Sequence, residues 1–258
     1  MFRQKKYICG NFLDVEIFQT PPKTRRIKRA IRVKESTPAQ RNLNDKNSKK
    51  HFVRLVHKNF DEKDLYVDLT YDKENIPQER EEVLRDIRNY VSRIKRWRKK
   101  RGMDPMKYIY VISNMDQQGR KVRYHVHMIM SGMDRDVAEK KWGKGYANTD
   151  RLRFDEHGVT GKSLYMARQA KGARSWGSST NLKRVEAVVS DNAVTRSVME
   201  RMINSPDDRE FFEKKYPGWI FTDCKINLNE NEEGWGIGVS VTIRMRRYDN
   251  HEVRKERR

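Results

Sequence analysis

The strongest constraint on the fold is a pair of strand-like segments in the middle of the chain. Residues 107–114 (KYIYVISN) and 121–130 (KVRYHVHMIM) are rich in apolar and β-branched residues, and they flank the polar segment MDQQGR. Two such segments around a short turn that contains glycine predict a β-hairpin. The chain therefore contains at least one antiparallel pair of strands.

The elements around this hairpin predict an α+β fold. Hydrophobic periodicity indicates helices over about 38–59 and 78–101, and a strand over 64–71. We also expect a small strand near 151–154, helices over about 162–170 and 191–203, and a closing hairpin within WIFTDCKINLNENEEGWGIGVSVTIRMRR. This order predicts a central antiparallel sheet with helices packed mainly on one face, completed by the C-terminal hairpin.

Length and charge suggest how the chain is divided. Its 258 residues correspond to one or two domains. We expect a basic, DNA-contacting extension and helix over 1–60, followed by one domain over 61–258. The second segment would contain both the central hairpin and the C-terminal hairpin.

The net charge of +21, from 57 Lys and Arg against 36 Asp and Glu, points to a polyanionic partner. Basic residues concentrate in 21–60 and in the run Arg93, Lys95, Arg96, Arg98, Lys99, Lys100 and Arg101. Such clusters suit a phosphate backbone, although a single run also fits a solvated helix face. Further candidate DNA contacts are Lys171, Arg174 and Trp176. Trp176 could stack on an unpaired base, or it could be a core residue.

Several functional classes are excluded or disfavoured by what the sequence does not contain. No apolar segment approaches the roughly 20 residues that cross a bilayer. The first residues do not read as a secretory signal, and the two cysteines have no CxxC spacing. The segment Gly161-Lys162-Ser163 has glutamate at position 156, where a phosphate-binding loop needs its first glycine. We therefore expect a reduced, cytoplasmic protein without a membrane partner and without ATPase activity.

His125 and His127 are the clearest candidates for metal binding. Residues two positions apart on a strand point to the same face, so the two imidazoles converge. The preceding strand and turn offer an oxygen donor, either Asn114 or Asp116, depending on the register of the hairpin; Asp116 is the tentative third ligand. Two imidazoles and one oxygen leave open positions on a divalent ion such as Mg²⁺ or Mn²⁺.

A second candidate group lies in SLYMARQ. Tyr165, Arg168 and Gln169 are three and four residues apart, which places them on one face of a helix. A tyrosine can act as a covalent nucleophile, and a neighbouring arginine can hold a phosphate. The alternative is that Tyr165 is an ordinary half-buried core residue.

The order of these motifs resembles the HUH endonucleases, in particular the single-tyrosine rolling-circle replication initiators (Rep proteins) of bacterial plasmids and phages. The three motifs are similar to Leu65–Tyr71, Tyr124–Ser131 and Leu164–Gln169. Further segments, including RSWGSSTNLKR, resemble small replication-associated proteins of Gram-positive bacteria and their phages. The resemblance covers the chain from about residue 35 onward.

The resemblance implies a palm of the ferredoxin or RRM type and a specific reaction. Tyr165 would attack a DNA phosphodiester and retain a 5′-phosphotyrosine, while His125 and His127 would hold the divalent cation. The family commonly has lysine three residues after the tyrosine, where this chain has Arg168, and its third metal ligand is usually acidic. The implied partners are single-stranded or hairpin origin DNA and a separate helicase and polymerase.

Other functions fit the same residues. A conjugative relaxase or a small transposase would use the same tyrosine chemistry on a different DNA site. A non-enzymatic basic nucleic-acid-binding protein would need neither a metal ion nor Tyr165.

Overall fold

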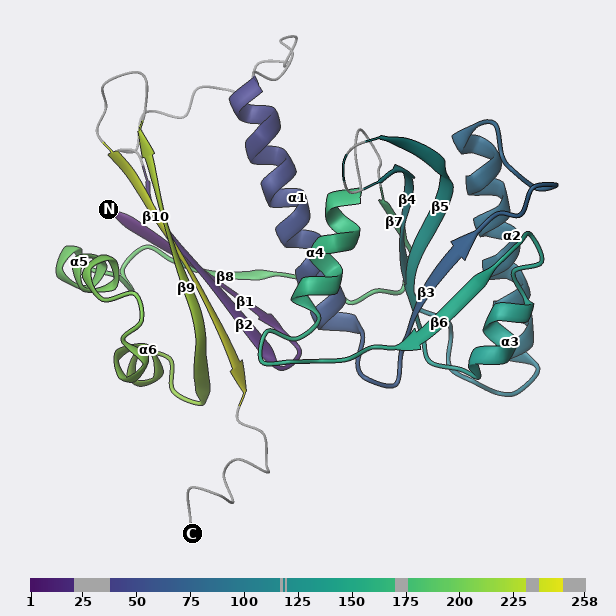
Figure 1. Ribbon diagram of the computed structural model, residues 1–258. Coiled ribbons are helices and arrows are strands. Elements are labelled where there is room, and N and C mark those ends of the chain that lie inside the picture. The colour runs from purple at the N-terminus through teal and green to yellow at the C-terminus, as the bar shows by residue number, and fades with distance from the viewer. Residues whose placement is uncertain (21–37, 117, 119, 170–175, 231–236, 248–258) are drawn as a thin grey trace, which may run out of the picture. The chain divides into compact units, whose positions relative to one another are not determined.

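The computed structural model describes residues 1–20, 38–116, 118, 120–169, 176–230 and 237–247 (Figure 1). The chain divides into two compact units. One contains residues 48–184, and the other combines residues 1–47 with 185–258. This division differs from the expected boundary at residue 60, because strands from the two ends of the chain pair in one sheet.

The unit of residues 48–184 contains a five-stranded antiparallel sheet in the order β6-β3-β5-β4-β7. The predicted central hairpin is present as β4 and β5, with His125 opposite Ser113 and His127 opposite Val111. The strands are β3 (Leu65–Thr70), β4 (Tyr108–Met115), β5 (Lys121–Met130), β6 (Ala147–Arg151) and β7 (Trp176–Ser178).

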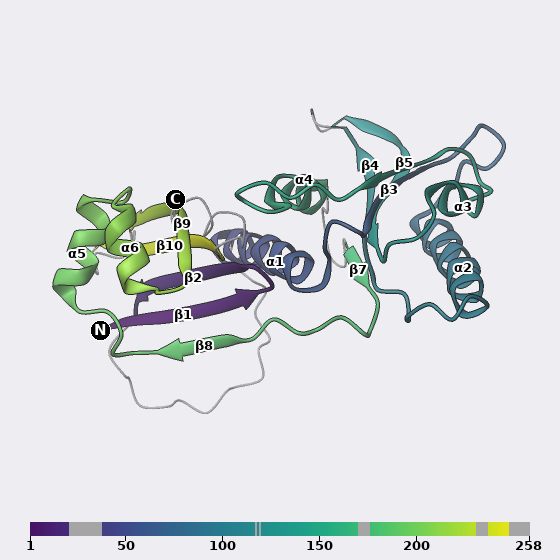
Figure 2. The same cartoon turned by 90° about the horizontal axis from the view of Figure 1, so that it is seen from below.

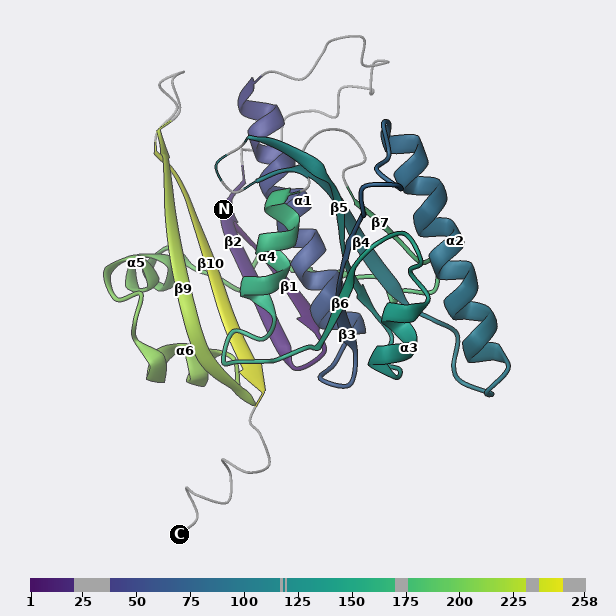
Figure 3. The same ribbon diagram turned by 45° about the vertical axis from the view of Figure 1, so that its right-hand side comes forward.

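One face of this sheet packs against helices α2 (Arg80–Lys99) and α3 (Arg135–Lys140), as Figure 3 shows. The alternation in β3 sends Leu65, Val67 and Leu69 into this core, where they are fully buried with Tyr90 and Trp142. Each such side chain contributes about 1.5–3 kcal/mol on burial. The other alternate residues of β3, Tyr66 and Asp68, therefore point to the opposite face.

The opposite face of the same sheet also carries helices, α4 (Thr160–Gln169) and the part of α1 (Pro38–Asn59) from residue 48 on (Figure 1). Phe52 of α1 packs edge-on against Trp176 of β7, with ring centroids 5.6 Å apart. The expectation of helices mainly on one face is therefore wrong for this sheet. The reason lies in β5, where every residue from Val126 to Met130 is buried, as in a strand covered on both sides.

The other unit has its own five-stranded antiparallel sheet, in the order β8-β1-β2-β10-β9. Helices α5 (Arg196–Asn204) and α6 (Arg209–Lys215) pack against it, and Val15, Ile17 and Phe212 are fully buried in the core between them (Figure 2). The strands are β1 (Phe2–Cys9), β2 (Phe12–Gln19), β8 (Ala187–Ser190), β9 (Trp219–Glu230) and β10 (Ile237–Arg247).

The C-terminal hairpin belongs to this second sheet, which corrects the expectation of one sheet. Strand β10 pairs with β2, so the hairpin does not join the sheet that carries the histidines. The N-terminal strand β2 is its partner and pairs in turn with β1, and the sequence pattern did not predict these two strands. The overall class is nevertheless α+β, as expected, with two antiparallel sheets.

The remaining expected elements are present with shifted bounds. The strand expected near 151–154 is β6, which ends at Arg151, and the helix expected from 191 begins at Arg196. Thr195 caps this helix, because its hydroxyl accepts a hydrogen bond from the backbone N–H of Val198 at 3.3 Å. None of the helices in the described part of the chain combines the length and apolar character needed to cross a membrane.

Gly145, just before β6, provides a test of this fold. It has a φ of +140°, and a Cβ at this position would lie 2.6 Å from the carbonyl oxygen of Thr70. We expect Gly145→Ala to lower the free energy of unfolding by about 3 kcal/mol, because the obstacle is backbone that cannot move aside. Urea titration followed by circular dichroism measures this change.

Gly143→Ala is the matched control. Gly143 also has a positive φ, of +63°, but a Cβ there would meet nothing within 4 Å. This substitution should lower the free energy of unfolding by only about 1–2 kcal/mol, which is the penalty for a left-handed backbone conformation. Equal losses in the two variants would contradict the close approach of the chain at Gly145.

Candidate active site

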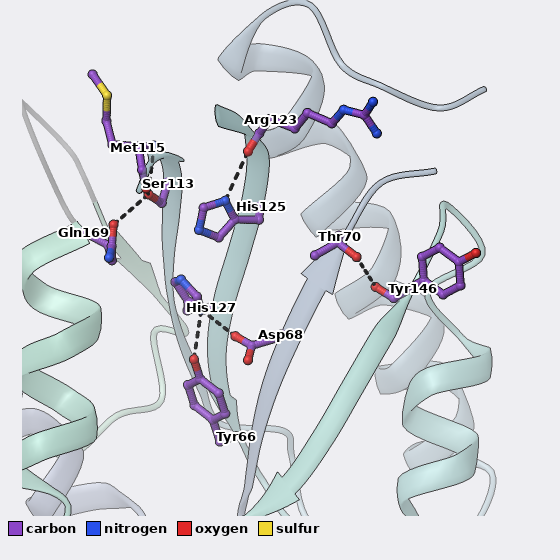
Figure 4. Close-up of polar contacts among 10 residues, drawn as sticks. All are labelled: Tyr66, Asp68, Thr70, Ser113, Met115, Arg123, His125, His127, Tyr146 and Gln169. Carbon is purple, nitrogen blue, oxygen red and sulfur yellow. Dashed lines mark hydrogen bonds and ion pairs between the residues drawn. The ribbon is translucent and has the colours of Figure 1, made fainter. Parts of the chain in front are cut away.

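The two histidines lie side by side on β5, one of the inner strands of their sheet. Their ring centroids are 4.9 Å apart and the ring planes are nearly perpendicular, at 83° (Figure 4). Both side chains point to the face that carries α4, as their two-residue spacing predicts. His127 is only 5% exposed, and His125 is half-buried.

His127 is held by two residues of the neighbouring strand β3. Its Nδ1 lies 2.5 Å from Asp68 Oδ1 and 2.8 Å from the hydroxyl of Tyr66 (Figure 4). Asp68 is directly opposite His127 in the strand register. Burial opposes ionisation of Asp68, but hydrogen bonds from His127 and Tyr66 outweigh it and lower the pKa of this carboxyl. Asp68 is therefore an ionised acceptor for the Nδ1–H of His127.

Tyr66 is a second donor to this carboxylate. Burial, together with the charge of Asp68, raises the pKa of the Tyr66 phenol. The phenol is therefore neutral and donates its proton to a hydrogen bond. The hydroxyl of Tyr66 is engaged with His127, which gives Tyr66 a positioning role beside the histidines.

The remaining nitrogen of each imidazole is available to bind a cation. His127 Nε2 is buried and has no hydrogen-bond partner among the residues that the structure describes. His125 Nδ1 lies 3.1 Å from the carbonyl oxygen of Arg123, to which it donates, so its Nε2 carries the free lone pair. Burial also lowers the pKa of His125, which favours the neutral imidazole that a metal requires.

These residues fit a divalent cation. A carboxylate that fixes the tautomer of a histidine is the usual support for a metal-bound imidazole. In the described part of the chain, His, Cys, Asp and Glu form no cluster of three metal ligands. An ion held by only the two imidazoles of His125 and His127 would keep open positions, as Lewis-acid chemistry on a phosphate needs.

Helix α4 brings Tyr165 to the histidines. The ring centroids of Tyr165 and His127 are 5.2 Å apart, at an angle of 70°. On the same helix face, Lys162 Nζ lies 4.0 Å above the ring of Tyr66, and Gln169 accepts a hydrogen bond of 3.0 Å from Ser113 Oγ. The helix thus contacts β3, β5 and β4 at successive turns, which fixes Tyr165 over the central strand.

Asp116, the tentative third ligand, lies elsewhere. Its carboxylate accepts hydrogen bonds from the backbone N–H and the Nε of Arg120, at 2.8 and 2.6 Å, within the hairpin turn. The register puts Ser113 rather than Asn114 opposite His125. Asp68 is the acid beside the histidines, and the motif spacing did not identify it. The alternation of Leu65, Val67 and Leu69 is the signal that could have placed Asp68 on the histidine face.

Among the predicted phosphate and DNA contacts, Arg168 is exposed in the last turn of α4, three residues after Tyr165. Trp176 is half-buried against Phe52 and donates to Ser48 Oγ at 3.3 Å, which favours its interpretation as a core residue. Lys171 and Arg174 lie outside the described residues, as does most of the basic segment before α1.

The basic run of residues 93–101 forms the C-terminal end of α2 and the two residues after it, and α2 packs on the face of the sheet opposite α4 (Figure 3). Arg93 donates to the carbonyls of Lys141 and Trp142, and buried Arg98 donates to those of Asp104 and Gly132. These two arginines therefore have a structural role, because their guanidinium groups connect α2 to backbone carbonyls of other segments. The exposed cations of the run are Lys95, Arg96, Lys99, Lys100 and Arg101.

A comparison of the chain with protein-family models, with curated proteins and with solved structures found no match. The chemistry of the site must therefore be inferred from the residues themselves.

The role of Asp68 can be tested by metal binding. We expect Asp68→Asn to weaken Mn²⁺ binding about 10- to 100-fold, because the amide no longer fixes the imidazole of His127. Electron paramagnetic resonance titration of free Mn²⁺ measures this affinity. Asp116→Asn, at the acid paired with Arg120, should leave the affinity unchanged. Unaltered binding in Asp68→Asn, or an equal loss in both variants, would contradict this role.

The contribution of the basic run to DNA binding can be tested separately. Replacing Lys95, Lys99 and Lys100 together with glutamine should weaken binding to all DNA sequences equally. It should also flatten the plot of log affinity against log salt, by up to about 0.9 for each phosphate that the variant no longer neutralises. Arg98→Gln should instead lower thermal stability, because two backbone carbonyls lose a buried donor. An unchanged salt slope in the triple variant would identify the run as a solvated helix end.

Proposed function

We propose that this protein is a DNA strand-nicking and strand-joining enzyme of the HUH type that initiates rolling-circle replication. The observation that carries the proposal is the contact between Tyr165 and His127, whose ring centroids are 5.2 Å apart. A potential nucleophile thus lies beside two imidazoles, one of which has a buried nitrogen without a partner. This arrangement matches the order of motifs on which the sequence resemblance rests.

The proposed reaction is a transesterification at phosphorus. The phenol of Tyr165 gives up its proton to solvent and its oxygen forms a bond to the phosphorus, while the bond from phosphorus to the 3′ oxygen breaks. The 3′ oxygen takes up a proton and becomes a primer terminus, while the 5′ phosphate stays on the tyrosine. The same steps in reverse rejoin the strand without an external energy source.

The residues around Tyr165 would share the charge that develops on the phosphate. A divalent cation held by His125 and His127 would supply Lewis-acid stabilisation to the phosphate oxygens. Lys162 and Arg168 lie three residues before and after Tyr165, and both side chains are exposed, so they are accessible to a phosphate at Tyr165. Asp68 would position His127 through the short bond to Nδ1 and would not contact the substrate.

The high positive charge would bind the DNA backbone and steer it to this site. A conjugative relaxase or a transposase would use the same residues. The DNA site at which the covalent adduct forms distinguishes these two functions from replication. Replication would also need a helicase and a polymerase from the replicon or its host.

The decisive variant is Tyr165→Phe. We expect it to fold and to bind single-stranded DNA like the wild type but to form no covalent adduct with the 5′ side of a nicked oligonucleotide. Phenylalanine keeps the ring contact with His127 but has no oxygen to attack phosphorus. Incubation with Mn²⁺ and labelled candidate-origin strands, followed by denaturing electrophoresis, detects the adduct.

Tyr146→Phe is the matched control. Tyr146 is 78% exposed just before β6, and only its backbone carbonyl is bonded to Thr70 (Figure 4). This variant should form the adduct at the wild-type rate. An adduct that still forms in Tyr165→Phe and is lost in Tyr146→Phe would identify Tyr146 as the nucleophile. Equal DNA binding without an adduct in any form of the protein would favour a non-enzymatic binding protein.

A further inference from the structure

A pocket of about 270 Å³ adjoins the candidate active site. It lies between β3, β6 and the first turn of α4, all within the unit of residues 48–184. The residues that give it chemical character are Tyr66, Asp150, Arg153 and Lys162, with Leu152 and Val159 as apolar walls. The function proposed above assigns no role to this pocket.

Tyr66 connects the pocket to the histidines. Its hydroxyl bonds His127, while its ring lines the pocket beneath the ammonium group of Lys162. Lys162 is also one helical turn from Tyr165. A group in the pocket would therefore belong to a part of the substrate close to the phosphate that Tyr165 attacks.

The size of the pocket restricts what it can hold. Sites for drug-sized ligands usually enclose about 300–1,000 Å³, so this pocket lies just below that range. This volume is sufficient for one planar base. If single-stranded DNA crosses the site, as the proposed function requires, one unpaired base of that strand is a ligand of suitable size.

The polar groups that line the pocket include one carboxylate, which accepts hydrogen bonds, and several cationic side chains, which donate them. Asp150 is opposite Tyr66 in the strand register, so its side chain shares the face of the histidines, and it is exposed. Arg153 and Lys162 are exposed donors in the same wall. Arg151 is different, because its guanidinium bonds the carbonyls of Lys63 and Met133 and is engaged in the fold.

A carboxylate on a surface that faces DNA repels the phosphates, unless it accepts hydrogen bonds from a base. Guanine presents two adjacent donors, N1–H and the N2 amino group, that a carboxylate can accept together. Its O6 and N7 atoms accept from lysine and arginine. Adenine, cytosine and thymine each lack this pair of adjacent donors beside an acceptor.

We propose that this pocket receives an unpaired guanine next to the scissile phosphate, with Asp150 accepting from its N1–H and N2 amino groups. Lys162 or Arg153 donates to its O6 atom. The proposal rests on the proposed function, because it assumes that single-stranded DNA crosses the site. It makes Asp150 a residue that determines sequence specificity.

The test measures binding without cleavage. Fluorescence anisotropy of the full chain in EDTA compares oligothymidine strands that carry one central guanine, hypoxanthine, adenine or cytosine. Hypoxanthine is guanine without the N2 amino group. We expect the guanine strand to bind at least about fivefold more tightly than the other three, which corresponds to the lower end of the discrimination by a bidentate contact.

Asp150→Ala should abolish the preference for guanine and keep the affinity for plain oligothymidine. Asn148→Ala, at the exposed neighbour on the same face of β6, should keep the preference. Equal binding of the guanine and hypoxanthine strands by the wild type would overturn the proposal. So would a preference that persists in Asp150→Ala, or no binding to any strand. A protein that shows the preference but forms no adduct would refute the nicking function alone.

Discussion

The site depends on the bond between Asp68 and His127, because this bond determines which imidazole nitrogen carries the proton and which carries the lone pair. The two residues are directly opposite in the pairing of β3 with β5, so the backbone ladder itself sets their distance. Asp68 gives up part of its hydration, and the donors on His127 and Tyr66 compensate for it. Without an ionised acceptor at this position, the imidazole would have no fixed tautomer, and its buried Nε2 would have no defined role.

The second requirement is a rigid support for Tyr165, and α4 provides it by crossing the strands. Lys162 rests on Tyr66, Tyr165 packs against His127, and Gln169 accepts from Ser113. Because three turns of one helix contact three strands, a shift of the helix would break all three contacts together. Tyr165 and the two imidazoles are thus positioned by regular secondary structure, which supports more precise geometry than loops do.

The sequence predicted the parts of this site that follow from local periodicity. The spacing of His125 and His127 defined their common face, and the helical pattern placed Tyr165 and Gln169 on one side of α4. Asp68 was missed because the choice among acids depends on strand register, and a register irregularity after Ser113 changes what faces His125. Charge counts also could not distinguish Arg98, which donates to buried carbonyls, from Lys95, which is exposed.

The pairing of β2 with β10 affects how the chain reaches its native state. Residues 1–19 are synthesised well before residues 187–247, yet their sheet is incomplete until β8, β9 and β10 have been made. The histidine-bearing unit is continuous in sequence, and its strands can pair as they emerge. Long-range pairing carries the larger loop-closure cost and forms slowly. During translation, β1 and β2 therefore wait for their remaining partner strands, and their exposed edges would be vulnerable to aggregation in that interval.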